Sequence, residues 1–234
     1  MSLKLLFTPY TLKFNFDAGT SRGVLREKEV WYLKLFEEGN NTIYGMGEVA
    51  TIERLSVDYN ASFEEALAKI AGVLSKYNLP NNAEEVFAFV SELVPENLPA
   101  IRFGLETAML DLLNGGQRMI FENGFYRKGK DIPINGLIWM GDEAFMKEQI
   151  DAKLNAGFSC IKMKIGAIDF EAECQLLRYI RKHYPKEKLI LRVDANGAFR
   201  TEDCMLRLKA LEEFDLHSIE QPIMPKQPEL MALW

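Results

Sequence analysis

The sequence predicts an α+β domain over residues 1–131 and, over residues 132–234, about the first four βα units of a parallel (β/α) barrel. In the first part, strand patterns are followed by helix patterns without alternation, which is typical of α+β domains. In the second part, strand and helix patterns alternate regularly, which indicates a parallel sheet. A composition of 48% hydrophobic and 26% charged residues is that of an ordinary globular protein.

The first domain begins with strands. Apolar residues alternate with polar ones around Phe14 and again around Leu33, as in half-buried antiparallel strands. Between these strands lies Asp17–Gly23, a run of small and turn-forming residues that predicts a mobile loop. A second loop is expected at Gly45–Glu48.

Three helices are expected next. Ser62–Glu65 has the sequence of a capping box, in which serine and glutamate side chains bind exposed backbone N–H groups at a helix start. Further helical spacing covers residues 83–93 and 99–113, and Asn114–Gly116 provides a stop signal.

The second domain repeats one βα unit. We expect strands at 132–140, 160–165, 189–194 and 217–220, and helices at 142–155, about 169–183, from Thr201 and near Gln227. A complete eight-unit barrel needs roughly 250 residues, more than residues 132–234 provide. We therefore expect the natural protein to be longer than this chain.

Several classes of function are disfavoured by composition. A net charge of −6 without a basic cluster argues against nucleic acid as a partner. No apolar run approaches the ~18 residues that span a membrane, and no signal peptide is evident, so we expect a cytoplasmic protein. Three separated cysteines indicate neither a disulfide framework nor a zinc site. A doubly wound nucleotide-binding protein is disfavoured because no glycine-rich phosphate motif occurs.

Two lysines on the second predicted strand are candidates for acid–base chemistry. Lys162 and Lys164 alternate with apolar residues and therefore share one face. If that face lines a barrel, burial and mutual repulsion would lower either lysine pKa from about 10.4 towards 7–8, as a general base requires. The alternative is a pair of solvated lysines on an edge strand.

Two carboxylates follow at the ends of the next strands. Asp194 and Glu220 each fall where barrel enzymes place their chemistry. Carboxylates that face a common interior suit a hard cation such as Mg²⁺. Taken singly, either residue has the alternative role of capping the following helix.

These motifs together resemble one branch of a known superfamily. Lys162-Met-Lys164, Asp194-Ala-Asn196 and Glu220-Gln-Pro222 occur in this order, with Asp194 30 residues after Lys164 and Glu220 26 residues after Asp194. This pattern is similar to the muconate-lactonizing branch of the enolase superfamily. The Gly45–Glu48 segment and the helix around residues 103–112 resemble its N-terminal capping domain, and the resemblance covers essentially the whole chain.

The resemblance implies an α+β capping domain on a TIM-like barrel that removes the proton next to a carboxylate with the help of Mg²⁺. By position, Lys164 would be the base and Lys162 would contact the substrate carboxylate. Asp194 and Glu220 would bind the metal. The substrate-binding residues would be Arg192, Asn196, Ser21 and Arg22.

Within this branch, Thr20–Leu25 and Ile134–Gly141 look most like o-succinylbenzoate synthases. That family dehydrates a succinyl-hydroxycyclohexadiene carboxylate in menaquinone biosynthesis. Dipeptide epimerases and N-acylamino acid racemases share the same lysines and metal ligands and are the main alternative, followed by a non-catalytic scaffold with the same fold. The family also uses an acidic ligand on strand five and a lysine on strand six, so we expect the chain as given to be inactive. The sequence does not determine the oligomeric state, and it is compatible with a homo-oligomer.

Overall fold

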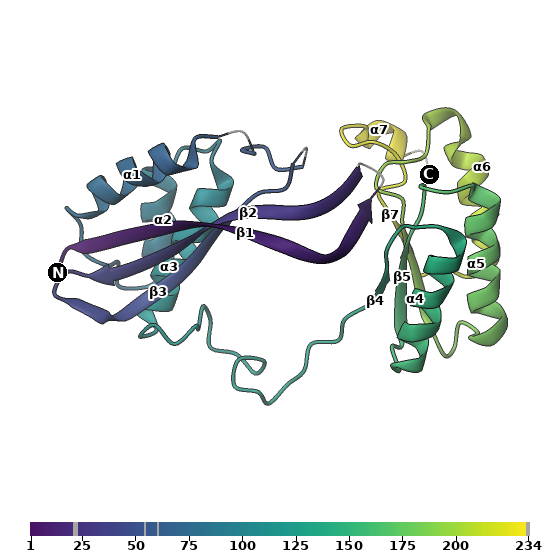
Figure 1. The fold of residues 1–234 in the computed structure, drawn as a ribbon, viewed down its shortest axis with the longest axis horizontal. Helices are drawn as coiled ribbons and strands as arrows, with labels where there is room; N and C mark the ends of the chain where they lie inside the picture. The colour runs from purple at the N-terminus through teal and green to yellow at the C-terminus, as the bar shows by residue number, and fades with distance from the viewer. Residues whose placement is uncertain (21–22, 54, 60, 233–234) are drawn as a thin grey trace. The chain divides into compact units, whose positions relative to one another are not determined.

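The computed structural model describes residues 1–20, 23–53, 55–59 and 61–232. The chain divides into two compact units, one of residues 1–14 and 27–132 and the other of residues 15–26 and 133–234. The first contains a three-stranded sheet and the second a four-stranded sheet, each with its own helices (Figure 1). No helix in the described part of the chain is long and apolar enough to cross a bilayer.

The sheet of the first unit has the strand order β1-β2-β3. Its strands are β1 (Leu3–Thr20), β2 (Gly23–Glu37) and β3 (Asn40–Ala50), of which β2 and β3 run antiparallel. The predicted helices are confirmed as α1 (Phe63–Leu74), α2 (Ala83–Leu93) and α3 (Pro99–Leu113). Apolar residues of the sheet and of all three helices form one buried core, which includes Leu33, Leu67, Val90 and Leu105.

The described residues of the predicted loop at Asp17–Gly23, and the whole of the one at Gly45–Glu48, are strand instead, and residues 21 and 22 of the first loop lie outside the described residues. β1 continues through Thr20 and β2 begins at Gly23, and Gly45–Glu48 lies inside β3. The glycines of β3 serve helix packing: a Cβ on Gly45 would lie 1.8 Å from the carbonyl oxygen of Ala108. One on Gly47 would lie 1.9 Å from that of Gly104. Small residues are therefore needed here because the backbones of α3 and β3 touch.

The capping-box prediction at Ser62 is also wrong. Ser62 precedes α1, but its side chain makes no capping hydrogen bond, because its backbone angles (φ −76°, ψ 76°) depart from the extended conformation of a normal N-cap. At α2 the expected chemistry does occur, since the Asn82 side chain accepts a hydrogen bond from the Glu85 N–H at 2.9 Å. Side-chain caps therefore follow backbone geometry as well as residue type.

A buried carboxylate joins α3 to its surroundings. Asp111 is 1% exposed. Its Oδ1 accepts from the backbone N–H groups of Arg118 (2.6 Å) and Met119 (3.1 Å). Its Oδ2 accepts from the Met46 N–H at 2.9 Å and from the Arg118 guanidinium at 2.8 Å. Both oxygens are thus fully used, and the side chain holds β3 and the turn after α3 together.

The second unit has a parallel sheet in the order β4-β5-β6-β7. Its strands are β4 (Gly136–Ile138), β5 (Cys160–Lys164), β6 (Ile190–Asp194) and β7 (Ser218–Glu220). The helices are α4 (Glu143–Asn155), α5 (Phe170–His183), α6 (Thr201–Leu211) and the short α7 (Pro228–Met231). The βα order predicted from sequence is confirmed, although β4 is shorter than residues 132–140.

One face of this sheet is apolar and the other carries the charged residues. Ile161, Met163, Leu191 and Val193 are at most 1% exposed and pack in a core with residues of α4, α5 and α6. These helices lie along one side of the strands (Figure 1). Because side chains alternate along a strand, the residues between them point to the opposite face.

Arg181 joins three parts of this unit through main-chain oxygens. Its Nε donates to the carbonyl of Phe214 at 2.6 Å and its Nη2 to that of Asp215 at 2.9 Å, both in the segment that follows α6. Its Nη1 donates to the carbonyl of Leu189 at 2.9 Å, just before β6. The guanidinium thus binds α5 to the segments that lead into two strands of the sheet.

Candidate active site

The predicted site residues fall in two rows across neighbouring strands. Lys164 is opposite Asp194 in the β5–β6 pair, and Asp194 is opposite Glu220 in the β6–β7 pair. One pleat earlier, Lys162 is opposite Arg192. All three residues of the first row are the last residues of their strands, so they meet at the carboxyl edge of the sheet.

The lysines and carboxylates form a connected charge cluster. The Lys162 ammonium donates a short hydrogen bond to Glu220 Oε2 and lies 3.5 Å from Asp194 Oδ2. The Lys164 ammonium lies 3.3 Å from the same Asp194 oxygen. Asp194 is 3% exposed, whereas the Glu220 side chain is 60% exposed. The cluster therefore has a buried inner part and an open outer part.

Asn196 links Asp194 to Lys164. Its side-chain oxygen accepts from the Lys164 ammonium at 2.7 Å, while its backbone N–H (3.0 Å) and Nδ2 (2.8 Å) donate to Asp194 Oδ1. Asn196 has a φ of 48°, a left-handed conformation that asparagine tolerates better than most residues. The local backbone thus folds the amide back over the end of β6.

The side chain of Arg192 has different hydrogen-bond partners from that of Asn196. Its Nη1 donates to the side chain of Asn135 at 3.2 Å, and Asn135 also accepts from the Cys160 thiol at 3.0 Å. The Nε of Arg192 is buried without a hydrogen-bond partner in the described structure. Arg192 therefore lies one row below Asp194 and is held by the segment that precedes β4.

The expectation of a lowered lysine pKa is wrong for Lys162. Burial alone lowers the pKa of this ammonium, but its hydrogen bond to Glu220 and the charges of Asp194 and Glu220 outweigh burial and raise it. Strand alternation identified the two lysines as neighbours but not the two carboxylates as their direct partners. Repulsion between the lysines is therefore not the dominant interaction in this arrangement.

The two carboxylates fit a cation. Asp194 Oδ2 and Glu220 Oε2 both contact the Lys162 ammonium, so their oxygens converge on one positive charge. Mg²⁺ prefers such oxygen ligands and commonly keeps several water or substrate oxygens. Within residues 1–20, 23–53, 55–59 and 61–232, no group of three or more histidine, cysteine or acidic side chains is suitable for a metal. The residues present therefore fit as two ligands of a larger set.

Three further residues were missed from sequence. Trp139 follows the last residue of β4, and the Lys164 ammonium lies 5.8 Å from the centroid of its ring. Gln149 of α4 binds the Trp139 backbone. The rule that identified Asp194, chemistry at strand ends, would also have found Trp139. No comparable signal identifies Gln149.

The third missed residue is Glu173 of α5. It is 1% exposed, and its Oε1 accepts from the backbone N–H groups of Gly166 (2.6 Å) and Ala167 (3.3 Å), in the loop after Lys164. Its Oε2 has no hydrogen-bond partner in the described structure. Burial raises the pKa of this carboxyl, against the opposing effect of the backbone hydrogen bonds.

The remaining predicted residues, Ser21 and Arg22, lie outside the described residues.

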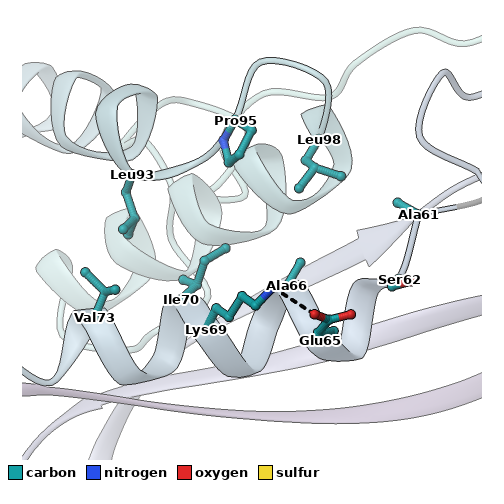
Figure 2. A pocket seen from close by; sticks show the side chains of 10 residues that line it. All are labelled: Ala61, Ser62, Glu65, Ala66, Lys69, Ile70, Val73, Leu93, Pro95 and Leu98. Atoms are coloured by element: carbon teal, nitrogen blue, oxygen red, sulfur yellow. Dashed lines mark hydrogen bonds and ion pairs between the residues drawn. The ribbon is translucent and has the colours of Figure 1, made fainter.

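A separate pocket lies within the first unit. It has a volume of about 420 Å³ and lies between α1 and the segment from the end of α2 to Leu98 (Figure 2). Its lining is mostly apolar, and its charged groups are Lys69 and Glu65, which form an exposed ion pair at 2.7 Å. This pocket lacks the convergent polar groups of a catalytic site.

Comparison with known proteins agrees with the geometry. A family model described as "Enolase C-terminal domain-like" matches residues 145–233. The chain is 39% identical to an o-succinylbenzoate synthase of Desulfotalea psychrophila, over 98% of this chain and 67% of that protein.

Solved structures have the same fold. MenC from Desulfotalea psychrophila matches with a TM-score of 0.82 and 36% identity, over 100% of this chain and 68% of that one. The o-succinylbenzoate synthase of Thermosynechococcus elongatus, complexed with Mg in its active site, matches with a TM-score of 0.69. Its identity is 23%, over 97% of this chain and 64% of that one, so it supports the fold alone. This chain thus spans about two thirds of the length of these relatives, and it belongs to the o-succinylbenzoate synthase family of the enolase superfamily.

Proposed function

We propose that the natural protein is an o-succinylbenzoate synthase, a carbon–oxygen lyase that dehydrates 2-succinyl-6-hydroxy-2,4-cyclohexadiene-1-carboxylate in menaquinone biosynthesis. The observation that carries the proposal is the row of Lys164, Asp194 and Glu220 on adjacent strand ends, in a chain 39% identical to a named synthase. Its partner is then a small-molecule carboxylate, and its location the cytoplasm.

The fold supports a division of roles along the chain. Residues 1–131 would form the capping domain, and residues 132–234 the first four βα units of the barrel. Four parallel strands joined in sequence order through helices support this reading. Ser21 and Arg22 would contribute to substrate binding.

Lys164 would perform the proton transfers. As a neutral amine, it takes the proton from the ring carbon that bears the carboxylate, and the electron pair left behind shifts towards that carboxylate. The carbon–oxygen bond to the ring hydroxyl then breaks, and the Lys164 ammonium donates its proton to the departing oxygen. Water leaves, the amine is neutral again, and aromatisation of the ring supplies driving force. Asn196, 2.7 Å from the ammonium, would orient it for both transfers.

The other residues would hold the substrate in position. Lys162 would bind the substrate carboxylate as an ammonium, a role that suits its raised pKa. Arg192 would support the site from the row below. Asp194 and Glu220, whose oxygens converge at the strand ends, would hold Mg²⁺. Bound there, the metal supplies positive charge that stabilises negative charge developing on the substrate carboxylate.

The main alternative is a dipeptide epimerase or an N-acylamino acid racemase. Those reactions require a base on each face of the reacting carbon. In the described part of the chain, both candidate lysines come from β5 and share one face of the sheet. Dehydration by one lysine needs only that face, which favours the synthase. A non-catalytic scaffold would not need the lysines and carboxylates to converge.

The test uses the natural full-length protein with the cyclohexadiene substrate and Mg²⁺. Formation of the aromatic ring is followed by absorbance, for the wild type, for Lys164→Ala and in the presence of a chelator. We expect turnover in the wild type and a loss of about 10²–10⁴-fold in the variant. Folded, metal-loaded wild-type protein that gives no turnover would contradict the proposal, and α-proton exchange in dipeptides and N-acylamino acids would then be measured.

A further inference from the structure

Trp139 stands beside the proposed base. It is the first residue after β4, at the edge of the sheet where Lys164 ends β5. The Lys164 ammonium lies over its indole, 5.8 Å from the ring centroid. The ring of Phe16, which belongs to the same unit, meets the indole nearly edge-on, with centroids 6.1 Å apart and an interplanar angle of 75°. The indole is thus an aromatic surface next to the reacting position.

The backbone of Trp139 is fixed by a side chain. Gln149 Oε1 accepts from the Trp139 N–H at 2.9 Å, and Gln149 Nε2 donates to the Trp139 carbonyl at 3.0 Å. This two-point contact reproduces the hydrogen bonds that a neighbouring strand would make. Two residues on, a Cβ at Gly141 would lie 2.3 Å from the ring of Phe145, so the turn is also packed tightly against α4. Trp139 is therefore held at a defined position.

We propose that Trp139 is a specificity-determining residue whose indole face forms the wall for the six-membered ring of the substrate, and that Gln149 is its positioning residue. The inference rests on the proposed function. The conjugated diene of this ring gains packing energy on an indole, as does the aromatic ring that forms from it, and an ammonium beside the same indole gains a cation–π contact. Aliphatic N-acylamino acids lack a ring that makes this contact, so Trp139 would favour the cyclic substrate.

The first experiment compares variants of the full-length protein. We expect Trp139→Leu to raise KM for the cyclohexadiene about tenfold and Trp139→Phe about threefold, with kcat nearly unchanged, because stacking on a ring wall contributes to binding throughout the reaction. Gln149→Leu should act like Trp139→Leu. Gln149→Glu keeps the acceptor for the Trp139 N–H and should therefore lose less. An unchanged KM in folded Trp139→Leu protein would overturn the proposal.

The second experiment does not depend on turnover. Titration with the product, o-succinylbenzoate, should quench tryptophan fluorescence in the wild type and in Trp31→Phe, whose indole instead packs against Phe63 within the first unit. The quench should be lost in Trp139→Phe. Equal quenching in Trp139→Phe would contradict the inference, whereas a wild type that neither binds product nor turns over substrate would contradict the proposed function itself. Circular dichroism of each variant separates these outcomes from misfolding.

Discussion

Asp111 and Asp194 are almost equally buried, at 1% and 3% exposed, but their partners differ in kind. Three of the four donors to Asp111 are backbone N–H groups, which are fixed by the fold. Asp194 accepts from one backbone N–H, that of Asn196, and its other partners are the side chains of Asn196, Lys162 and Lys164. Donors on long side chains can move to a substrate or metal, whereas backbone donors cannot. The comparison separates a carboxylate that holds structure from one that is available for chemistry.

The largest effect that tests this comparison is expected on activity. Asp194→Asn should lower kcat/KM of the full-length enzyme at least about 10³-fold, because a proposed metal ligand and a lysine partner are both lost. The new amide oxygen can still accept from Asn196, so the free energy of unfolding should fall by only about 1 kcal/mol. Steady-state kinetics and urea unfolding on the same samples measure both quantities. A loss of stability above about 3 kcal/mol would instead assign Asp194 a structural role.

Asp111→Asn is expected to show the reverse pattern. The Asp111→Asn amide N–H₂ turns a donor towards the donors of Met46 and Arg118, or towards those of Arg118 and Met119. We expect the free energy of unfolding to fall by about 2–4 kcal/mol. Denaturant titration measures this change, and kcat of the protein that remains folded should stay within about threefold of the wild type. A variant that is as stable as the wild type but has a reduced kcat would contradict the structural role assigned to Asp111.

Glu173 is intermediate between Asp111 and Asp194. One of its carboxylate oxygens accepts from backbone N–H groups, and the other has no partner in the described structure. Burial raises its folded-state pKa, so between its unfolded and folded pKa values the native state binds more protons and stability falls as pH rises. Glu173→Gln removes this titration. Relative to the wild type, the variant should therefore gain stability from about pH 4 to pH 7, by about 1 kcal/mol.

The measurement is urea unfolding at several pH values. Glu171→Gln is the matched control, since Glu171 lies in the same helical turn but is exposed and bound to Arg178. At neutral pH this control should remain within about 0.5 kcal/mol of the wild type. A stability difference between Glu173→Gln and wild type that does not change with pH would contradict the expected titration.

Strand alternation and strand-end positions were sufficient to predict the neighbours at the site. Lys164, Asp194 and Glu220 are in register because parallel strands of similar length end at one edge. Partner identity was not predictable, because alternation specifies a face and leaves open which charges meet on it. The raised pKa of Lys162 follows from two carboxylates whose approach depends on side-chain conformations.

In the first unit the errors have a different origin. In the local sequence, Gly45 and Gly47 look like the glycines of a loop. Only their contacts with α3, which is distant in the sequence, show that glycine is needed here because the two backbones touch. Ser62 fits a capping box by type, but its backbone angles prevent the bond. Local sequence therefore predicted the helices and the parallel strands better than the segments whose conformation is set by tertiary packing.

Arg181 has a consequence for how this chain can vary over evolutionary time. All the acceptors described for its guanidinium are main-chain carbonyls, at Phe214, Asp215 and Leu189 among others. Since every amino acid supplies such a carbonyl, those three positions can drift in identity without loss of the junction. Position 181 has no such freedom, because lysine lacks the planar fork that reaches several oxygens at once. Selection that preserves this junction therefore acts on residue 181, whereas residues 189, 214 and 215 are free to change.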